Sequence, residues 1–175
     1  LIFPSGNFPS KRASSINTIN HAKSFAKKGF NVDLVCTNLN FDFIEKPENV
    51  NLIHLEIGKF RKIIFILRQI ISKKYFLVFS RDMFVSFLFG FRFKIIHDLH
   101  ALPNYLGNKY NLLFIFCYKI LHNVQFLCIS KLLFEDVIDY YGYSKKIHKL
   151  NDVSGWKISN DFKIENPLRV CYFGS

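Results

Sequence analysis

Short apolar segments alternate with longer segments of helical periodicity, and this alternation constrains the fold more than any other feature of the sequence. The segments predicted as strands are residues 1–3, 31–36, 50–56, 75–79, 94–97, 125–129, 147–150 and 169–173. The segments predicted as helices are residues 11–28, 59–73, 82–90, 109–122 and 131–141. Alternating strands and helices build βαβ units whose right-handed crossovers place helices on both faces of a parallel sheet. The sequence therefore predicts an α/β fold with a Rossmann-like, doubly wound parallel sheet.

The same pattern predicts the domain organisation. Residues 1–150 form the predicted domain, the polar residues 151–167 a linker, and residues 168–175 the start of a further domain. The chain opens inside one apolar run and closes just after another. We therefore expect it to be truncated at both ends.

The composition favours a folded, basic protein. Half of the 175 residues are hydrophobic, which excludes intrinsic disorder. The formal net charge of +11 attracts polyanions, although a lysine-rich solvated surface has the same composition. Four cysteines lie in apolar contexts without a Cys-x-x-Cys pair, and we expect them to be reduced core residues of a cytoplasmic protein: Cys36, Cys117, Cys128 and Cys171. No uncharged apolar run reaches the roughly 18 residues that suggest a membrane span.

Residues 59–74, "KFRKIIFILRQIISKK", form a basic amphipathic segment. Lysines and arginines flank and interrupt an apolar face, as in helices that lie on a membrane surface. A core helix with a basic outer face has nearly the same sequence. Both interpretations stay open at this stage.

The candidate site lies where strands end, because ligands of open parallel sheets bind at the carboxyl ends of the strands. In "IIHDLHALP", residues 95–103, an apolar run ends in two histidines and an aspartate. Alternation along a strand places Asp98 and His100 on one face and His97 on the other, which disfavours a shared metal ion. Asp98 and His100 are therefore candidate site residues, with polar residues that merely reach solvent as the alternative. An aspartate beside a histidine orients the ring and raises its pKa.

The loop after the first strand is a second candidate. Gly6 precedes a helix whose first turn carries Lys11 and Arg12, where the helix dipole disfavours cations unless an anion binds there. The alternative is that both cations extend into water. The chain contains no Gly-x-Gly-x-x-Gly pattern, which argues against a dinucleotide cofactor.

Two further strand ends carry polar residues. In "FSRDMF", Arg81 could clamp an anion, or could form a surface pair with Asp82, which suits the first turn of a helix. Ser130 is predicted as a helix N-cap, because it lacks the Gly-x-Ser-x-Gly context of a hydrolase nucleophile.

In their order and spacing these segments resemble the N-terminal domain of GT-B glycosyltransferases of the family 4 type. The matching stretches are "FPSGNFPSKRASSINTINHAKSFAKKGFNVDLV", "VFSRD", "IIHDLHALP", "FLCISKLLFEDVIDYYGYSKKIHKLNDVSGW" and "LRVCYFGS". Asp98 stands where the family has a Glu in its Glu-x-His strand end, and the family's glycine-rich first loop keeps only Gly6.

The resemblance implies a hexosyltransferase that moves a sugar from a nucleotide-sugar to a glycan or lipid-linked acceptor, with retention and without a bound metal or other cofactor. This domain would shape the acceptor side, and a C-terminal domain would hold the donor, so the chain alone is expected to be inactive. His100 and Asp98 would face the reacting sugar, whereas Gly6, Lys11, Arg12 and Arg81 would meet the diphosphate or the acceptor. The expected setting is cell-envelope polysaccharide synthesis in the cytoplasm, with peripheral contact to an anionic membrane.

Two alternatives remain at this stage. One is a sugar-nucleotide epimerase of the same architecture. The other is a basic module that binds membranes or nucleic acid. Nucleic acid is not expected as a partner, because the aromatic residues lie mainly in apolar runs that predict core packing rather than exposed stacking surfaces.

Overall fold

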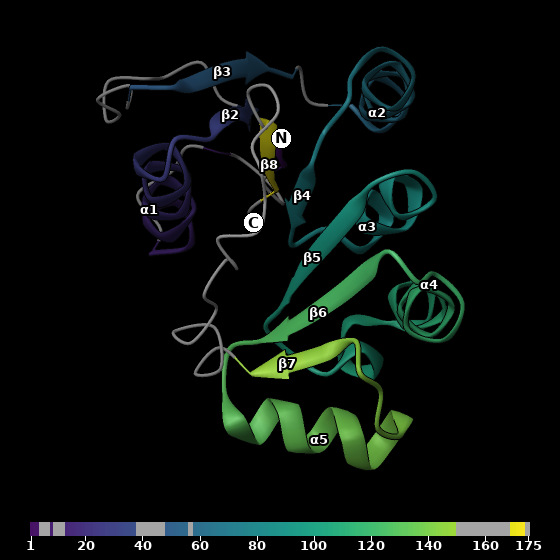
Figure 1. The fold of residues 1–175 in the computed structure, drawn as a ribbon. Helices are drawn as coiled ribbons and strands as arrows, with labels where there is room; N and C mark the ends of the chain where they lie inside the picture. Colours follow the sequence, from purple (N-terminus) through teal and green to yellow (C-terminus); the bar gives the residue numbers. More distant parts are fainter. Residues whose placement is uncertain (4–7, 9–12, 38–47, 56–57, 150–168, 174–175) are drawn as a thin grey trace.

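The computed structural model describes residues 1–3, 8, 13–37, 48–55, 58–149 and 169–173 (Figure 1). Its strands are β1 (Ile2–Phe3), β2 (Asn31–Cys36), β3 (Val50–His54), β4 (Leu77–Ser80), β5 (Lys94–Leu99), β6 (Val124–Cys128), β7 (Ile147–Lys149) and β8 (Arg169–Phe173). Its helices are α1 (Ala13–Lys27), α2 (Lys59–Ser72), α3 (Met83–Gly90), α4 (Asn108–Lys119) and α5 (Lys131–Tyr141), with a 3-10 turn, η1, at Pro103–Leu106. The predicted alternation of strands and helices is confirmed.

The recorded strand pairings are all parallel. One sheet has the order β1-β4-β8-β2-β3, with β1 also paired to β2, and a second has the order β5-β6-β7. The two sheets adjoin, because β4 lies beside β5 (Figure 1). The predicted Rossmann-like α/β fold is therefore what the chain adopts.

Strand alternation divides the apolar residues between two cores, one on each face. Ile95 and Leu99 of β5 belong to the core that residues of α2, α3, α4 and α5 complete. Ile96, between them in sequence, belongs to the core that α1 covers. Figure 1 shows α1 across the strands from α2, α3 and α4. Helices thus cover both faces, as the right-handed crossovers predict.

Strand β5 is longer than predicted. The apolar run ends before His97, but parallel pairing with β6 continues from Ile95 to Leu99, where Leu99 lies opposite Cys128. Asp98 is therefore an integral strand residue, paired with Leu127 and 5% exposed. Pairing with β6 therefore determines where β5 ends, and the sequence of β5 alone does not predict that pairing.

Strand β8 lies in the first sheet. Residues 168–175 were expected to open a further domain, yet Val170 to Phe173 pair with Leu77 to Ser80 of β4, and Arg169 pairs with Asn31 of β2. Strands β2 and β4 thus satisfy backbone hydrogen-bonding groups with a strand from the far end of the chain. Assignment of these residues to a separate domain stays a prediction.

The cysteines that the structure describes are buried and free: Cys36, Cys117 and Cys128. Burial raises the pKa of each thiol to about 12. The prediction of reduced core residues is confirmed for these three, whereas the side chain of Cys171 lies outside the description. Among the described helices, none combines the length and apolar character needed to traverse a bilayer.

Candidate functional site

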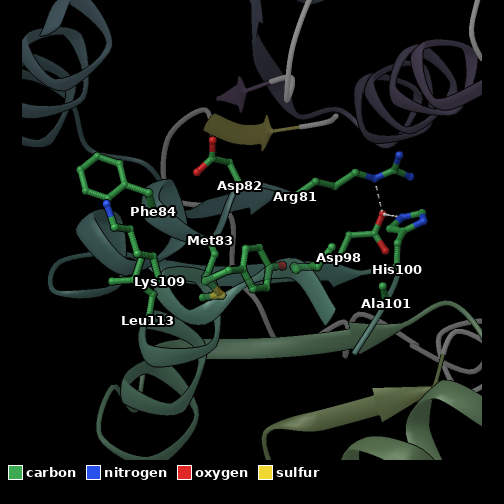
Figure 2. Close-up of a pocket in the computed structure, with 11 residues that line it drawn as sticks. Arg81, Asp82, Met83, Phe84, Asp98, His100, Ala101, Lys109 and Leu113 are labelled. Carbon is green, nitrogen blue, oxygen red and sulfur yellow. Dashed lines mark hydrogen bonds and ion pairs between the residues drawn. The ribbon is translucent and has the colours of Figure 1, made fainter. Parts of the chain in front are cut away.

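The carboxyl ends of β4 and β5 bring three of the predicted site residues together (Figure 2). Arg81 directly follows β4, Asp98 is the penultimate residue of β5, and His100 directly follows β5. Because these two strands are neighbours, a residue after one reaches a residue of the other. Arg81 Nε donates to Asp98 Oδ2 at 2.7 Å, and His100 Nε2 lies 2.8 Å from the same oxygen. The predicted common face of Asp98 and His100 is confirmed.

The Asp98 carboxylate is the electrostatic centre of this group. Its side chain and that of Arg81 are each 5% exposed. Burial by itself would raise the pKa of Asp98, but His100 and Arg81 together outweigh it and hold that pKa below its ordinary value. Asp98 is consequently ionised at neutral pH. Asp98 can therefore orient Arg81 and His100 but has no proton to donate.

His100 is the exposed member of the group. Its side chain is 41% exposed, whereas Asp98 is buried. An ionised carboxylate only accepts hydrogen bonds, so the proton between the two groups belongs to His100 Nε2. In the neutral ring this leaves Nδ1 as an acceptor. Such a nitrogen can accept a hydrogen bond from a ligand hydroxyl or act as a general base.

His97 lies on the opposite face of β5, as strand alternation predicts. It is fully buried, where Nδ1 is 2.8 Å from Ser86 Oγ and Nε2 is 2.9 Å from the Tyr110 hydroxyl. Burial lowers the pKa of His97 to about 4, so the ring is neutral at physiological pH. His97 therefore serves the packing of β5 against α3 and α4. No group of three or more histidines, cysteines or acids suited to a metal ion occurs within the described part of the chain.

A pocket of about 500 Å³ opens beside the charged group. Its lining comes from the ends of β4 and β5, from α3, from η1 and from the first half of α4: Arg81, Asp82, Met83, Phe84, Asp98, His100, Ala101, Leu106, Lys109, Tyr110 and Leu113 (Figure 2). In Figure 2 Lys109 lies on the side of the view away from Asp98 and His100. The pocket thus has the group of Arg81, Asp98 and His100 on one side and the Lys109 ammonium on the other. Met83 lies between them in Figure 2.

Asp82 has a structural role at the rim of this pocket. As the N-cap of α3, its Oδ1 accepts from the backbone N–H of Val85 at 3.1 Å. Its other oxygen pairs with Lys62 of α2. The predicted cap is confirmed, but the alternative of an Arg81–Asp82 pair is wrong, because each residue finds its partner on another element. Ser130 caps α5 as predicted, with its Oγ accepting from Leu133 N–H at 3.1 Å.

Three neighbours of the site were not predicted from the sequence. His21 of α1 stacks on Phe79 at a ring separation of 5.5 Å. Burial lowers its pKa, while Asp98, Arg81 and His100 are all close enough to act on it. Its position between Thr18 and Phe25 on the sheet-facing side of α1 is the one signal that could have found it. Lys109 and Tyr110 open α4 without any motif to mark them.

Gly6, Lys11 and Arg12 lie outside the described residues. Their assignment to a diphosphate therefore stays a prediction.

Comparisons with known proteins leave the family open. No model of a protein family matches the chain, and no curated protein is significantly similar to it. Function must accordingly be argued from the site itself.

Proposed function

We propose that the chain is the acceptor-side domain of a GT-B-type glycosyltransferase that uses a nucleotide-sugar donor. The observation that carries this proposal is the group of Arg81, Asp98 and His100 at the carboxyl edge of a Rossmann-like sheet, next to a pocket. This edge is where parallel α/β sheets bind ligands. We infer the reaction class, sugar transfer, from the resemblance of the sequence to family 4 enzymes.

The chemistry of the group suits a sugar hydroxyl. Asp98 is ionised and fixes the His100 ring through Nε2, so that Nδ1 is available to accept a hydrogen bond. His100 would then position a hydroxyl of the sugar or the acceptor. Arg81, whose charge Asp98 balances and whose side chain is buried, would act as a positioning residue.

Cations outside the group of Arg81, Asp98 and His100 would stabilise the leaving group. A nucleoside diphosphate that departs carries negative charge, which positive groups stabilise in the transition state. Lys11 and Arg12 remain the proposed partners of that charge, with Gly6 allowing close approach of the backbone. The donor nucleotide itself would be held by a further domain, and the acceptor would be a glycan or a lipid-linked saccharide.

The decisive experiment measures sugar transfer by the full-length protein. Radiolabelled UDP-, GDP- and TDP-hexoses would be offered with a lipid extract of cell envelopes as acceptor. We expect one donor to label the extract. His100→Ala should lower kcat/KM at least about tenfold without changing the unfolding transition, since it removes a positioned base or hydrogen-bond acceptor.

His122→Ala is the matched control, because His122 is also exposed but lies in the loop after α4. It should leave transfer unchanged. Absence of transfer from every donor, or equal activity of the two variants, would overturn the proposal. Conversion of the free nucleotide-sugar to an epimer, without transfer, would favour the epimerase instead.

A further inference from the structure

Helix α2 turns a row of large apolar side chains toward solvent. Phe60 and Ile71 are 78% and 75% exposed, and Ile64 and Leu67 are 54% and 46% exposed. Their spacing of 4, 7 and 11 residues after Phe60 places them on one face of the helix. Ile66 and Gln69, on the opposite face, are buried against the protein. We refer to Phe60, Ile63, Ile64, Leu67 and Ile71 as the α2 stripe.

This exposure favours a membrane-surface helix over a core helix with a basic outer face, the two interpretations that the sequence left open. A core helix with a basic outer face would bury its apolar residues and present polar ones. Helix α2 instead buries one apolar face and exposes another. Single exposed apolar residues are ordinary, but a row on one helix face marks an interaction surface.

Cations border the α2 stripe. Arg61 and Arg68 are exposed and lie seven residues apart, hence on the same side of the helix beside the stripe. Lys74 and Arg92 are exposed near the end of α2, where an Arg92 guanidinium nitrogen donates to the carbonyl of Ile70. Residues 59–74 contain no acidic residue. The surface is therefore apolar at its centre and positive at its edges.

We propose that the α2 stripe and its bordering cations bind the surface of an anionic lipid bilayer. The apolar side chains would enter the boundary between headgroups and acyl chains, and Arg61 and Arg68 would contact the anionic headgroups. A second copy of this chain fits less well, because it would bring an equally basic border and a net charge of +11 against the first. The inference does not depend on the proposed transferase activity.

Vesicle sedimentation tests the binding. The chain should sediment with vesicles of equal parts phosphatidylcholine and phosphatidylglycerol, and much less with vesicles of phosphatidylcholine alone. Binding should weaken as salt is raised, because counterions screen the cations. Failure to bind the anionic vesicles, or equal binding to both kinds, would overturn the proposal.

Substitutions locate the surface. Phe60→Ser combined with Ile71→Ser should reduce the partition coefficient on anionic vesicles at least about tenfold, because two inserted side chains are lost. Both positions are exposed, so folding should be unaffected. Leu132→Ser is the control, because Leu132 is 69% exposed on α5, far from α2 in Figure 1. This variant should bind the vesicles as tightly as the unmodified chain does.

The contribution of the cations is tested by comparing two pairs of substitutions, each of which removes two positive charges. Arg61→Gln with Arg68→Gln should weaken binding about tenfold or more and flatten its salt dependence, whereas the exposed pair Lys119→Gln with Lys145→Gln should not. Equal loss in both pairs would mean that net charge alone attracts the chain, which contradicts a specific surface. Light scattering tests the alternative that a second copy of the chain covers α2. A dimer that dissociates when the α2 stripe is substituted would support that alternative and overturn the proposal.

Discussion

At the scale of single residues, the site depends on one buried carboxylate that serves two partners. Asp98 accepts from both Arg81 and His100 through the same oxygen. This arrangement keeps a buried arginine charge balanced and leaves the histidine exposed at the pocket. Removal of Asp98 should therefore affect stability as well as the site.

Asp98→Asn should destabilise the folded chain by about 3 kcal/mol at neutral pH, because a buried cation loses its ionised partner. The pKa of Asp98 is lowered in the folded state, so its stabilisation is present above the ordinary carboxyl pKa and is lost as pH falls through the lower, folded-state pKa. The difference between the two proteins should shrink correspondingly in acid. Urea unfolding across a pH series measures this.

Asp139→Asn, at an exposed position of α5, provides the comparison and should have little effect at any pH. A loss from Asp98→Asn that is the same at neutral and acidic pH would contradict the assigned role of the carboxylate.

At the scale of elements, α3 shows how closely a helix can pack on a strand. It ends at Gly90, where a Cβ atom would lie 2.6 Å from Val124 Cγ2 and 3.1 Å from Leu121 Cδ1. Here glycine is required by contact with the start of β6 rather than by backbone freedom.

Gly90→Ala should destabilise the chain by about 1–3 kcal/mol, since the added methyl group forces β6 or α3 to shift. In a Val124→Ala background the same substitution should cost less, because the obstructing methyl groups are gone. A double-mutant cycle by urea unfolding measures this coupling. Equal costs in the two backgrounds would show that the close approach is relieved elsewhere.

At the scale of the whole molecule, two apolar cores on opposite faces of the strands bury the described cysteines. Cys36 belongs to the core under α1, whereas Cys117 and Cys128 belong to the other core. Thiol reactivity therefore reports opening of either face. Each thiol has a pKa of about 12 and is shielded from reagent.

In a Cys171→Ser background, an aromatic disulfide reagent should label none of the three cysteines rapidly in native buffer and all three in denaturant. The concentration of urea at which labelling begins should match the unfolding midpoint measured by circular dichroism. Rapid labelling of Cys36 alone would show that the face under α1 opens independently of the other.

Much of the fold could be predicted because its signals are local. Helical periodicity and capping residues placed α5 at Lys131–Tyr141 with Ser130 as its cap, and the structure has the same bounds. Strand alternation separated His97 from His100 before any partner was known. These features depend on residues near one another in the sequence.

The rest depended on which strands become neighbours. Arg81 meets Asp98 because β4 lies beside β5, and Lys62 meets Asp82 because α2 packs next to α3. His21 reaches the site from α1, which lies on the same face of β5 as Asp98. These contacts join residues of different segments, so no pattern within one segment predicts them.

The sequence by itself determined the α/β class, most element boundaries to within two residues and the common face of Asp98 and His100, because helix and strand periods act over a few residues. Only the tertiary structure decided how far β5 extends, which partner Arg81 takes, that β8 joins the first sheet, and that α2 exposes its apolar stripe. Each of these outcomes is set by packing between segments far apart in the chain, where the free energy of burial and pairing overrides what either segment prefers alone.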